Sequence, residues 1–137
     1  MLRLAFAFAL LTTPAFAFCT THGGVVDECA ALARRFPPGH VVPGQDYVSG
    51  GTFILRNAGC ISPDARFGFH SAHRFGVYEP HNPDVRRANE TQRRVLSQHP
   101  HLVHYLDSVG AFRSVGVTML TAEQVSALTH VPLCQLY

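Results

Sequence analysis

Hydrophobic residues recur at helical spacing in the first part of the chain. Val25, Cys29, Leu32 and Phe36 follow one another at steps of three and four residues, which is the period of an amphipathic helix. The Pro-Pro-Gly sequence at residues 37–39 cannot continue a helix. The pattern therefore predicts a helix that ends at about residue 36.

The second half of the chain predicts three further helices. Residues 84–98 are mostly polar and follow a proline, and residues 121–128 begin with Thr121, a preferred N-cap, and stop before the His-Val-Pro sequence at residues 130–132. Between them, residues 102–112 have apolar side chains at helical spacing. The predicted buried face of this helix consists of Leu102, Tyr105, Leu106 and Val109.

Two short segments are typical of strands. Residues 40–42 are His-Val-Val, and residues 65–70 alternate polar and apolar side chains, which is the period of a half-buried strand. Between them, Ser49 precedes two glycines and an apolar run, and the pattern predicts a helix with Ser49 as its N-cap. Strands that alternate with helices predict an α/β fold, and the length suits a single domain over residues 18–137.

The amino terminus resembles an export signal. An early Arg3 is followed by an apolar run at residues 4–11 and by Ala-Phe-Ala at residues 15–17, a small-x-small cleavage site. The run is shorter than the ~20 apolar residues that span a bilayer. We therefore expect residues 1–17 to be a signal peptide, no membrane attachment after its cleavage, and a periplasmic or secreted protein.

Four cysteines follow the predicted cleavage site: Cys19, Cys29, Cys60 and Cys134. An even number of cysteines in a small exported protein predicts two disulfides, with three connectivities open. No two of them have the spacing of a zinc site. The net charge of +2 and the lack of a basic stripe exclude nucleic acid as an expected partner.

Ser49 and His70 are the residues of most chemical interest. A serine becomes a nucleophile when a base takes its proton and nearby donors stabilise the oxyanion. Ser49 lies at a turn before Gly50, whose amide could serve as such a donor, and His70 ends a predicted strand. By spacing alone, a cap and a packed imidazole explain these two residues as well as catalysis does.

A resemblance to a known family favours catalysis. The segment GQDYVSGGTFILRNAG, residues 44–59, resembles the nucleophile segment of the Clp protease proteolytic subunit. PDARFGFHSAH, residues 63–73, resembles the strand that carries the base, and THGGVVDECAALARRF, residues 21–36, resembles the segment whose glycine amides line the oxyanion hole. The whole pattern is closest to small exported bacterial proteins of the ClpP/crotonase superfamily, and MLTAEQVSAL resembles a late helix of that family.

The resemblance implies a ClpP/crotonase-like core of short parallel strands and helices, and an exported serine hydrolase that acts on a peptide or a small ester or amide. Ser49 would be the nucleophile, His70 the base, and the backbone amides of Gly23, Gly24 and Gly50 the oxyanion hole. No cofactor or metal is implied. In the family, the region after the base strand often forms subunit contacts, which leaves a homo-oligomer open.

Two departures from the family pattern leave an alternative open. The third triad position falls near Val117, where there is no acid, so Asp107 or a backbone carbonyl would have to substitute. The strand before the first glycine turn overlaps the predicted signal, as in a truncated or degenerate member. The alternative is an inactive ClpP-like protein that binds a peptide or protein partner. A weaker hypothesis is a metal site at His99, His101 and His104.

Overall fold

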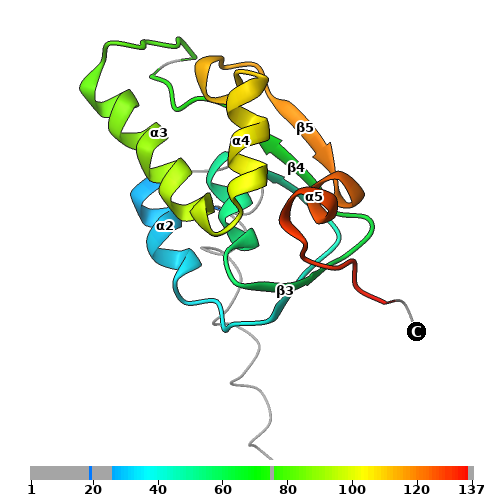
Figure 1. Cartoon of the computed structure of the whole chain (residues 1–137). Helices are drawn as coiled ribbons and strands as arrows, with labels where there is room; N and C mark the ends of the chain where they lie inside the picture. Colours follow the sequence, from blue (N-terminus) through cyan, green and yellow to red (C-terminus); the bar gives the residue numbers. More distant parts are fainter. Residues whose placement is uncertain (1–18, 20–25, 75, 136–137) are drawn as a thin grey trace, which may run out of the picture.

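The structure is a computed structural model that describes residues 19, 26–74 and 76–135. Helices and short strands alternate along the chain (Figure 1). Their order is α2 (Val26–Ala33), β1 (His40–Val42), β2 (Asp46–Val48), the 3₁₀ helix η1 (Ser49–Leu55), β3 (Ala58–Ile61), β4 (Arg66–Phe69), α3 (Pro83–Val95), η2 (Leu96–Gln98), α4 (Pro100–Ser108), η3 (Ala111–Arg113), β5 (Thr118–Thr121) and α5 (Ala122–Thr129).

The described strands form two small sheets. β1 pairs in parallel with β3, and a three-stranded sheet has the order β2-β4-β5. Within the second sheet β2 is parallel to β4, whereas β5 is antiparallel to it. The mixture of helices and small sheets confirms the predicted α/β class.

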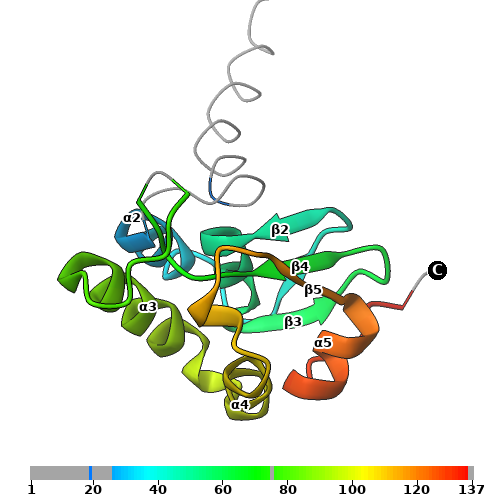
Figure 2. The same ribbon diagram turned by 90° about the horizontal axis from the view of Figure 1, so that it is seen from above.

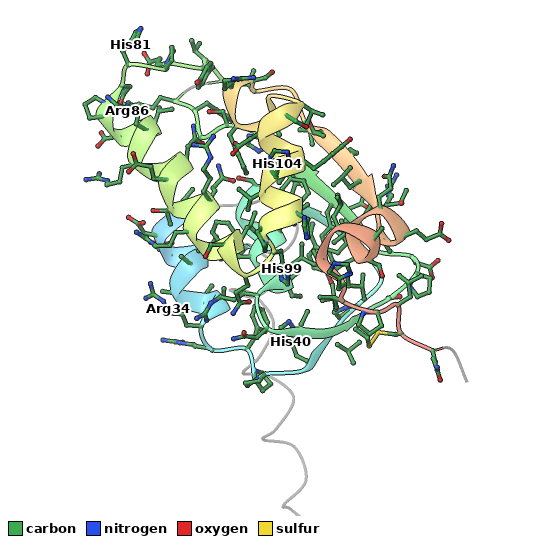
Figure 3. The ribbon with its side chains drawn as sticks, in the orientation of Figure 1. Arg34, His40, His81, Arg86, His99 and His104 are labelled. Atoms are coloured by element: carbon green, nitrogen blue, oxygen red, sulfur yellow. A yellow bond between two sulfur atoms is a disulfide. The ribbon has the colours of Figure 1, made fainter. Side chains whose placement is uncertain are left out.

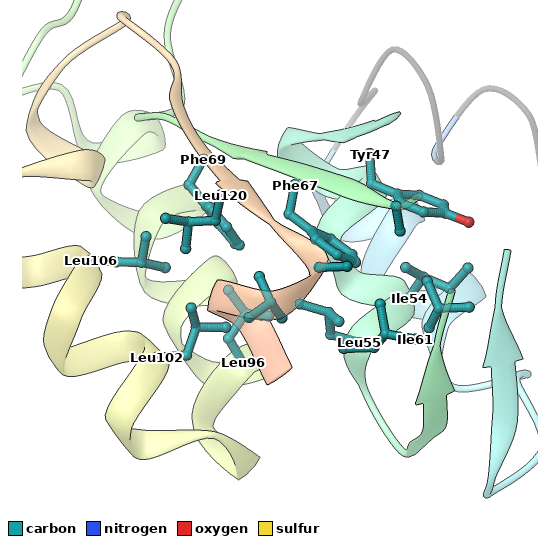
Figure 4. Close-up of a cluster of buried hydrophobic side chains, with 14 of the residues drawn as sticks. Tyr47, Ile54, Leu55, Ile61, Phe67, Phe69, Leu96, Leu102, Leu106 and Leu120 are labelled. Atoms are coloured by element: carbon teal, nitrogen blue, oxygen red, sulfur yellow. The ribbon is translucent and has the colours of Figure 1, made fainter. Parts of the chain in front are cut away.

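The main core lies between the inner face of the β2-β4-β5 sheet and the helices. Figure 2 shows α4 and α5 on one side of this sheet. Tyr47, Phe67, Phe69 and Leu120 project from the strands toward leucines of η1, η2 and α4 (Figure 4), and all are buried. Fully burying one such side chain contributes about 1.5–3 kcal/mol. This burial fixes which face of each strand points inward.

Local capping explains where several helices begin. The Asn82 side chain accepts hydrogen bonds from the amides of Asp84 and Val85 at the start of α3. Thr121 and Gln124 form a reciprocal capping box at the start of α5, which confirms Thr121 as the N-cap.

The end of α4 differs from the prediction. The helix stops at Ser108, because Gly110 adopts a left-handed conformation with φ +70°, a typical way for a helix to end. Val109 is consequently 48% exposed and does not belong to the buried face. Leu102 and Leu106 of that face are fully buried, as predicted.

Three strands were not predicted from the pattern: β2, β3 and β5. Each has only three or four residues, too few for alternation to show. The segment after β2 is also a 3₁₀ helix rather than an α-helix. Its first residues include two glycines, which disfavour regular α-helix.

Two disulfides connect distant parts of the chain. Cys19 is bonded to Cys29 of α2, and Cys60 of β3 is bonded to Cys134 after α5. The second bond joins residues 74 positions apart. The prediction of two disulfides is confirmed. The structure has one of the three connectivities that the sequence left open. The predicted signal peptide, residues 1–17, lies outside the described residues.

Gly59 provides a test of the packing between β1 and β3. A Cβ at Gly59 would overlap the carbonyl oxygen of Gly39 and lie 2.7 and 2.8 Å from its C and Cα atoms. We expect Gly59→Ala to lower the free energy of unfolding by about 1–3 kcal/mol, because backbone atoms must move apart. Urea unfolding measures this change.

Gly68→Ala is the matched control. Its Cβ would meet side-chain atoms, Val117 Cγ1 at 2.7 Å and Met119 Sδ at 2.8 Å. Both side chains are partly exposed and can rotate away. A loss of stability as large in Gly68→Ala as in Gly59→Ala would contradict the proposed cause.

Burial of Tyr47 should make the free energy of unfolding depend on pH in the alkaline range. Its ring is buried against Phe67 and its hydroxyl donates to the carbonyl of Pro43 at 2.7 Å. Burial raises the pKa of Tyr47 above its ordinary value of 10.0, so above that pH the unfolded chain loses this proton first. We expect the free energy of unfolding to fall with rising pH by up to about 1.4 kcal/mol per unit.

Tyr47→Phe removes this contribution. The variant should be less stable near neutral pH by about 1 kcal/mol through the lost hydrogen bond, yet its stability should fall less steeply above pH 10. Urea titrations across this pH range measure both slopes. The chain contains no lysine, so few other groups titrate there, and parallel slopes would contradict the prediction.

Candidate active site

Ser49 and His70 follow two neighbouring parallel strands. Val48, the last residue of β2, is paired with Gly68 of β4, and Phe69 is the last residue of β4. Neighbouring strands lie ~4.8 Å apart and rise ~3.3 Å per residue. The register therefore brings Ser49 and His70 to the same edge of the sheet, about one strand spacing and one residue step apart.

The backbone of Ser49 is unusual. Val48 occupies the N-cap position and Ser49 is the first residue of η1 with φ +56°, so the prediction that Ser49 caps this helix is wrong. A left-handed conformation costs a non-glycine residue roughly 1–2 kcal/mol. Such outliers occur preferentially at functional sites.

The positive φ also changes the direction of the Ser49 side chain. Strand alternation would direct Ser49 to the same inner face as Tyr47. Rotation from the usual parallel-strand φ of about −120° to +56° turns Cβ about half a turn around the N–Cα bond. This rotation favours the outer face of the sheet, and alternation places His70, next to the inward Phe69, on that same face.

The two side chains form no direct hydrogen bond in the described part of the chain. The carbonyl of Ser49 accepts a hydrogen bond from the Thr52 hydroxyl at 2.6 Å. Both residues are half-buried and remain accessible. Catalytic hydrogen bonds are often long or poorly aligned before substrate binds, so this arrangement is one that substrate would have to tighten.

The ring of His70 has a defined tautomer. Nδ1 lies 2.7 Å from the carbonyl oxygen of Ser71, and because a carbonyl can only accept, Nδ1 carries the proton. In the neutral ring Nε2 then has the free lone pair that a general base needs. The acceptor that fixes this tautomer is the backbone carbonyl of Ser71.

A buried polar network holds the segment after His70. The side-chain amide of Asn89 donates to Ser71 Oγ at 2.9 Å, and its carbonyl accepts from the amide of Ala72 at 2.8 Å. Gln92 Nε2 donates to the carbonyl of His70 at 3.2 Å. Both residues of α3 are buried, and the sequence interpretation missed them.

One signal in the sequence could have found these residues. Val85, Asn89, Gln92 and Leu96 recur at steps of four, three and four residues, the spacing of one helix face. Val85 and Leu96 are buried with them. Two amides on an otherwise apolar face indicate a buried polar contact, because buried polar groups need hydrogen-bond partners.

The predicted oxyanion hole is described only in part. Gly50 is buried in the first turn of η1, where backbone amides lack partners within the helix. Gly23 and Gly24 lie outside the described residues. η1 is a 3₁₀ helix of seven residues, so the amide of Gly50 itself, rather than a long helix dipole, is the candidate donor.

A small apolar pocket lies between α2 and η1. Gly50 and Gly51 contribute to its lining together with the cysteines of the first disulfide and apolar residues of both helices. Neither Ser49 nor His70 belongs to this lining. The pocket therefore borders the candidate site through the glycines but does not contain the dyad.

Asp107 pairs with Arg93 and not with His70. Its Oδ1 accepts from Nη2 of Arg93 at 2.7 Å and from Nε of Arg93 at 3.1 Å. The guanidinium of Arg93 also lies over the ring of Phe112, 5.4 Å from its centroid. Asp107 is thus part of an ion pair between α3 and α4.

The histidines near α4 do not form a metal site. His99 is buried and its Nε2 donates to the carbonyl of Leu55 at 3.0 Å, so this nitrogen has no lone pair for a metal ion. His104 lies further along the helix (Figure 3), and His101 contacts His130 edge-on. Among the described residues, no three potential ligands lie close enough to hold a metal ion.

His73 lies beside the candidate base. The ring centroids of His70 and His73 are 5.6 Å apart. His73 Nδ1 accepts from the amide of Gly76 at 3.0 Å, so its neutral ring carries the proton on Nε2. The two imidazoles therefore have opposite tautomers.

Within the described residues, no helix has the length and apolar character needed to cross a membrane. Comparison of the chain with protein-family models, with curated proteins and with solved structures gave no match.

Proposed function

We propose that the protein is a serine hydrolase in which Ser49 is the nucleophile and His70 the general base. The observation that carries the proposal is the β2–β4 register, which brings a serine with φ +56° and a histidine with a fixed tautomer to one edge of the sheet. A nucleophile, an adjacent base and a group that orients the base are the parts such a site requires.

The chemistry follows from these positions. The Ser49 hydroxyl attacks an acyl carbon while His70 Nε2 takes its proton, and a tetrahedral intermediate forms. The amide of Gly50 donates to the developing oxyanion, which needs donors in place before the reaction. His70 then returns the proton to the leaving amine or alcohol as the acyl bond breaks, and water hydrolyses the acyl-serine with the same base.

The surroundings support a substrate with an apolar portion. Val117 and Met119 are 48% and 44% exposed and lie over Gly68 on the outer face of the sheet. Because Thr118 is paired with Phe69, Val117 lies beside His70. A peptide or a small ester or amide with an apolar side chain would contact this surface next to the dyad.

The proposal includes the family and the location. The resemblance of residues 44–59 and 63–73 to the nucleophile and base segments of the ClpP/crotonase superfamily supports an exported, ClpP-like hydrolase. Two disulfides, Cys19–Cys29 and Cys60–Cys134, are typical of an oxidising compartment. We propose a periplasmic or secreted location on these grounds.

Labelling with a fluorophosphonate tests the enzyme directly. The wild-type protein should react covalently at one serine, and Ser49→Ala should abolish the reaction. His70→Ala should lower the labelling rate by about 10²–10⁴-fold, the usual contribution of a general base. Mass spectrometry of the labelled peptide identifies the modified residue.

Ser97→Ala is the matched control. Ser97 is exposed, and its hydroxyl donates to the carbonyl of Arg94 in the last turn of α3. This variant should label at the wild-type rate. Equal labelling of wild type and Ser49→Ala, or labelling of neither, would overturn the hydrolase and leave the inactive peptide-binding protein, whose peptide retention should survive Ser49→Ala.

A further inference from the structure

We propose that the peptide group between Ser71 and Ala72 replaces the triad's acid, and that Asn89 is the positioning residue that holds and polarises it. The inference deepens the proposed function and rests on it for its catalytic consequence. Its structural content is a hydrogen-bonded chain that can be measured without any substrate.

The hydrogen bonds that connect Asn89 to His70 pass through one peptide unit. On one side its carbonyl, that of Ser71, accepts from His70 Nδ1–H at 2.7 Å. On the other side its N–H, that of Ala72, donates to Asn89 Oδ1 at 2.8 Å. Because N–H and C=O of a peptide are joined by resonance, a hydrogen bond at the amide increases the negative charge on the oxygen that faces His70.

The orientation of the Asn89 amide is determined by its partners. Its Nδ2 donates to Ser71 Oγ at 2.9 Å and to the carbonyl of Phe112 at 3.3 Å, while Ser71 Oγ in turn donates to the carbonyl of Ala72 at 2.8 Å. Reversing the amide would place its nitrogen against the Ala72 N–H and its oxygen against the Phe112 carbonyl. Asn89 therefore presents an acceptor to Ala72.

Gln92 completes the network from the next turn of α3. Its Nε2 donates to Asn89 Oδ1 at 3.1 Å and to the carbonyl of His70 at 3.2 Å. Its Oε1 is buried and has no hydrogen-bond partner in the described part of the chain. Reversing this amide would set its oxygen against two acceptors. The observed orientation leaves Oε1 unsatisfied but keeps both N–H groups bonded, one to Asn89 and one to the carbonyl of His70.

The segment is held on its other side as well. The amide of Ser71 donates to the carbonyl of Ser114 at 2.8 Å, and Ser71 and Gln92 are both fully buried, with Asn89 7% exposed. The peptide unit therefore has no freedom to turn its carbonyl away from the imidazole. A neutral peptide held this way fixes the tautomer of His70, one of the two tasks of a triad carboxylate.

Nitrogen-15 NMR of the histidine rings tests the inference. In the wild-type protein at neutral pH, the neutral ring of His70 should carry its proton on Nδ1. Asn89→Ala should shift the ring toward the Nε2–H tautomer, because the polarised acceptor and the restraint on the peptide are lost. Asn89→Asp retains an oxygen acceptor for Ala72 and should retain the Nδ1–H tautomer.

Asn82→Ala is the matched control on the same helix. It removes the N-cap of α3 but no member of the network, so it weakens the helix and should leave the His70 tautomer unchanged. A wild-type ring protonated on Nε2, or an unchanged tautomer in folded Asn89→Ala, overturns the inference. If Asn89→Ala does not fold, Asn89→Asp decides, since loss of the Nδ1–H form there also overturns it.

The fluorophosphonate reaction supplies the catalytic readout. Asn89→Ala should label about tenfold more slowly than wild type, the value of about one hydrogen bond. Asn89→Asp keeps the acceptor for Ala72 but loses both donations of the amide, so it should label faster than Asn89→Ala. Asn82→Ala should stay within about twofold of wild type. Equal labelling by wild type and Asn89→Ala overturns the positioning role. Absence of labelling in every protein, with the tautomer result intact, contradicts the hydrolase but leaves the hydrogen-bonded chain established.

Discussion

Parallel pairing of β2 with β4 brings two strand ends, and with them Ser49 and His70, to one edge of a small sheet. The pairing is three residues long, so its hydrogen bonds alone could not hold the register. Burial of Tyr47, Phe67 and Phe69 on the inner face fixes it, because a slip of one residue would turn these rings toward water. Hydrophobic packing beneath the sheet therefore positions the polar groups at its edge.

Burial also determines the polar network on α3. Asn89 and Gln92 occupy positions on a helix face that otherwise packs apolar side chains, and an unsatisfied amide there would cost about 1–3 kcal/mol. Both polar side-chain atoms of Asn89 have partners, which belong to Ser71, Ala72, Phe112 and Gln92. The network thus links a helix to the residues that follow the base strand.

Much of the helical structure could be predicted from the sequence, because caps and periodicity are local. Thr121 with Gln124 determines the start of α5, and the proline-rich stretch after α2 determines an end. The short strands could not be predicted in the same way. β2 and β5 are defined by the neighbours that supply their hydrogen bonds, and segments of three or four residues have no period that distinguishes them from turns.

The sequence by itself determined the α/β class, the two disulfides, and Ser49 and His70 as the residues to examine. Only the tertiary structure decided that β2 lies in register beside β4, that Ser49 has a positive φ rather than a capping role, and that the Ser71–Ala72 peptide and Asn89 lie behind His70. The reason is physical: helix period and caps involve residues a few positions apart, whereas the strand register and the polar network join residues about 20 positions apart through burial and hydrogen bonds.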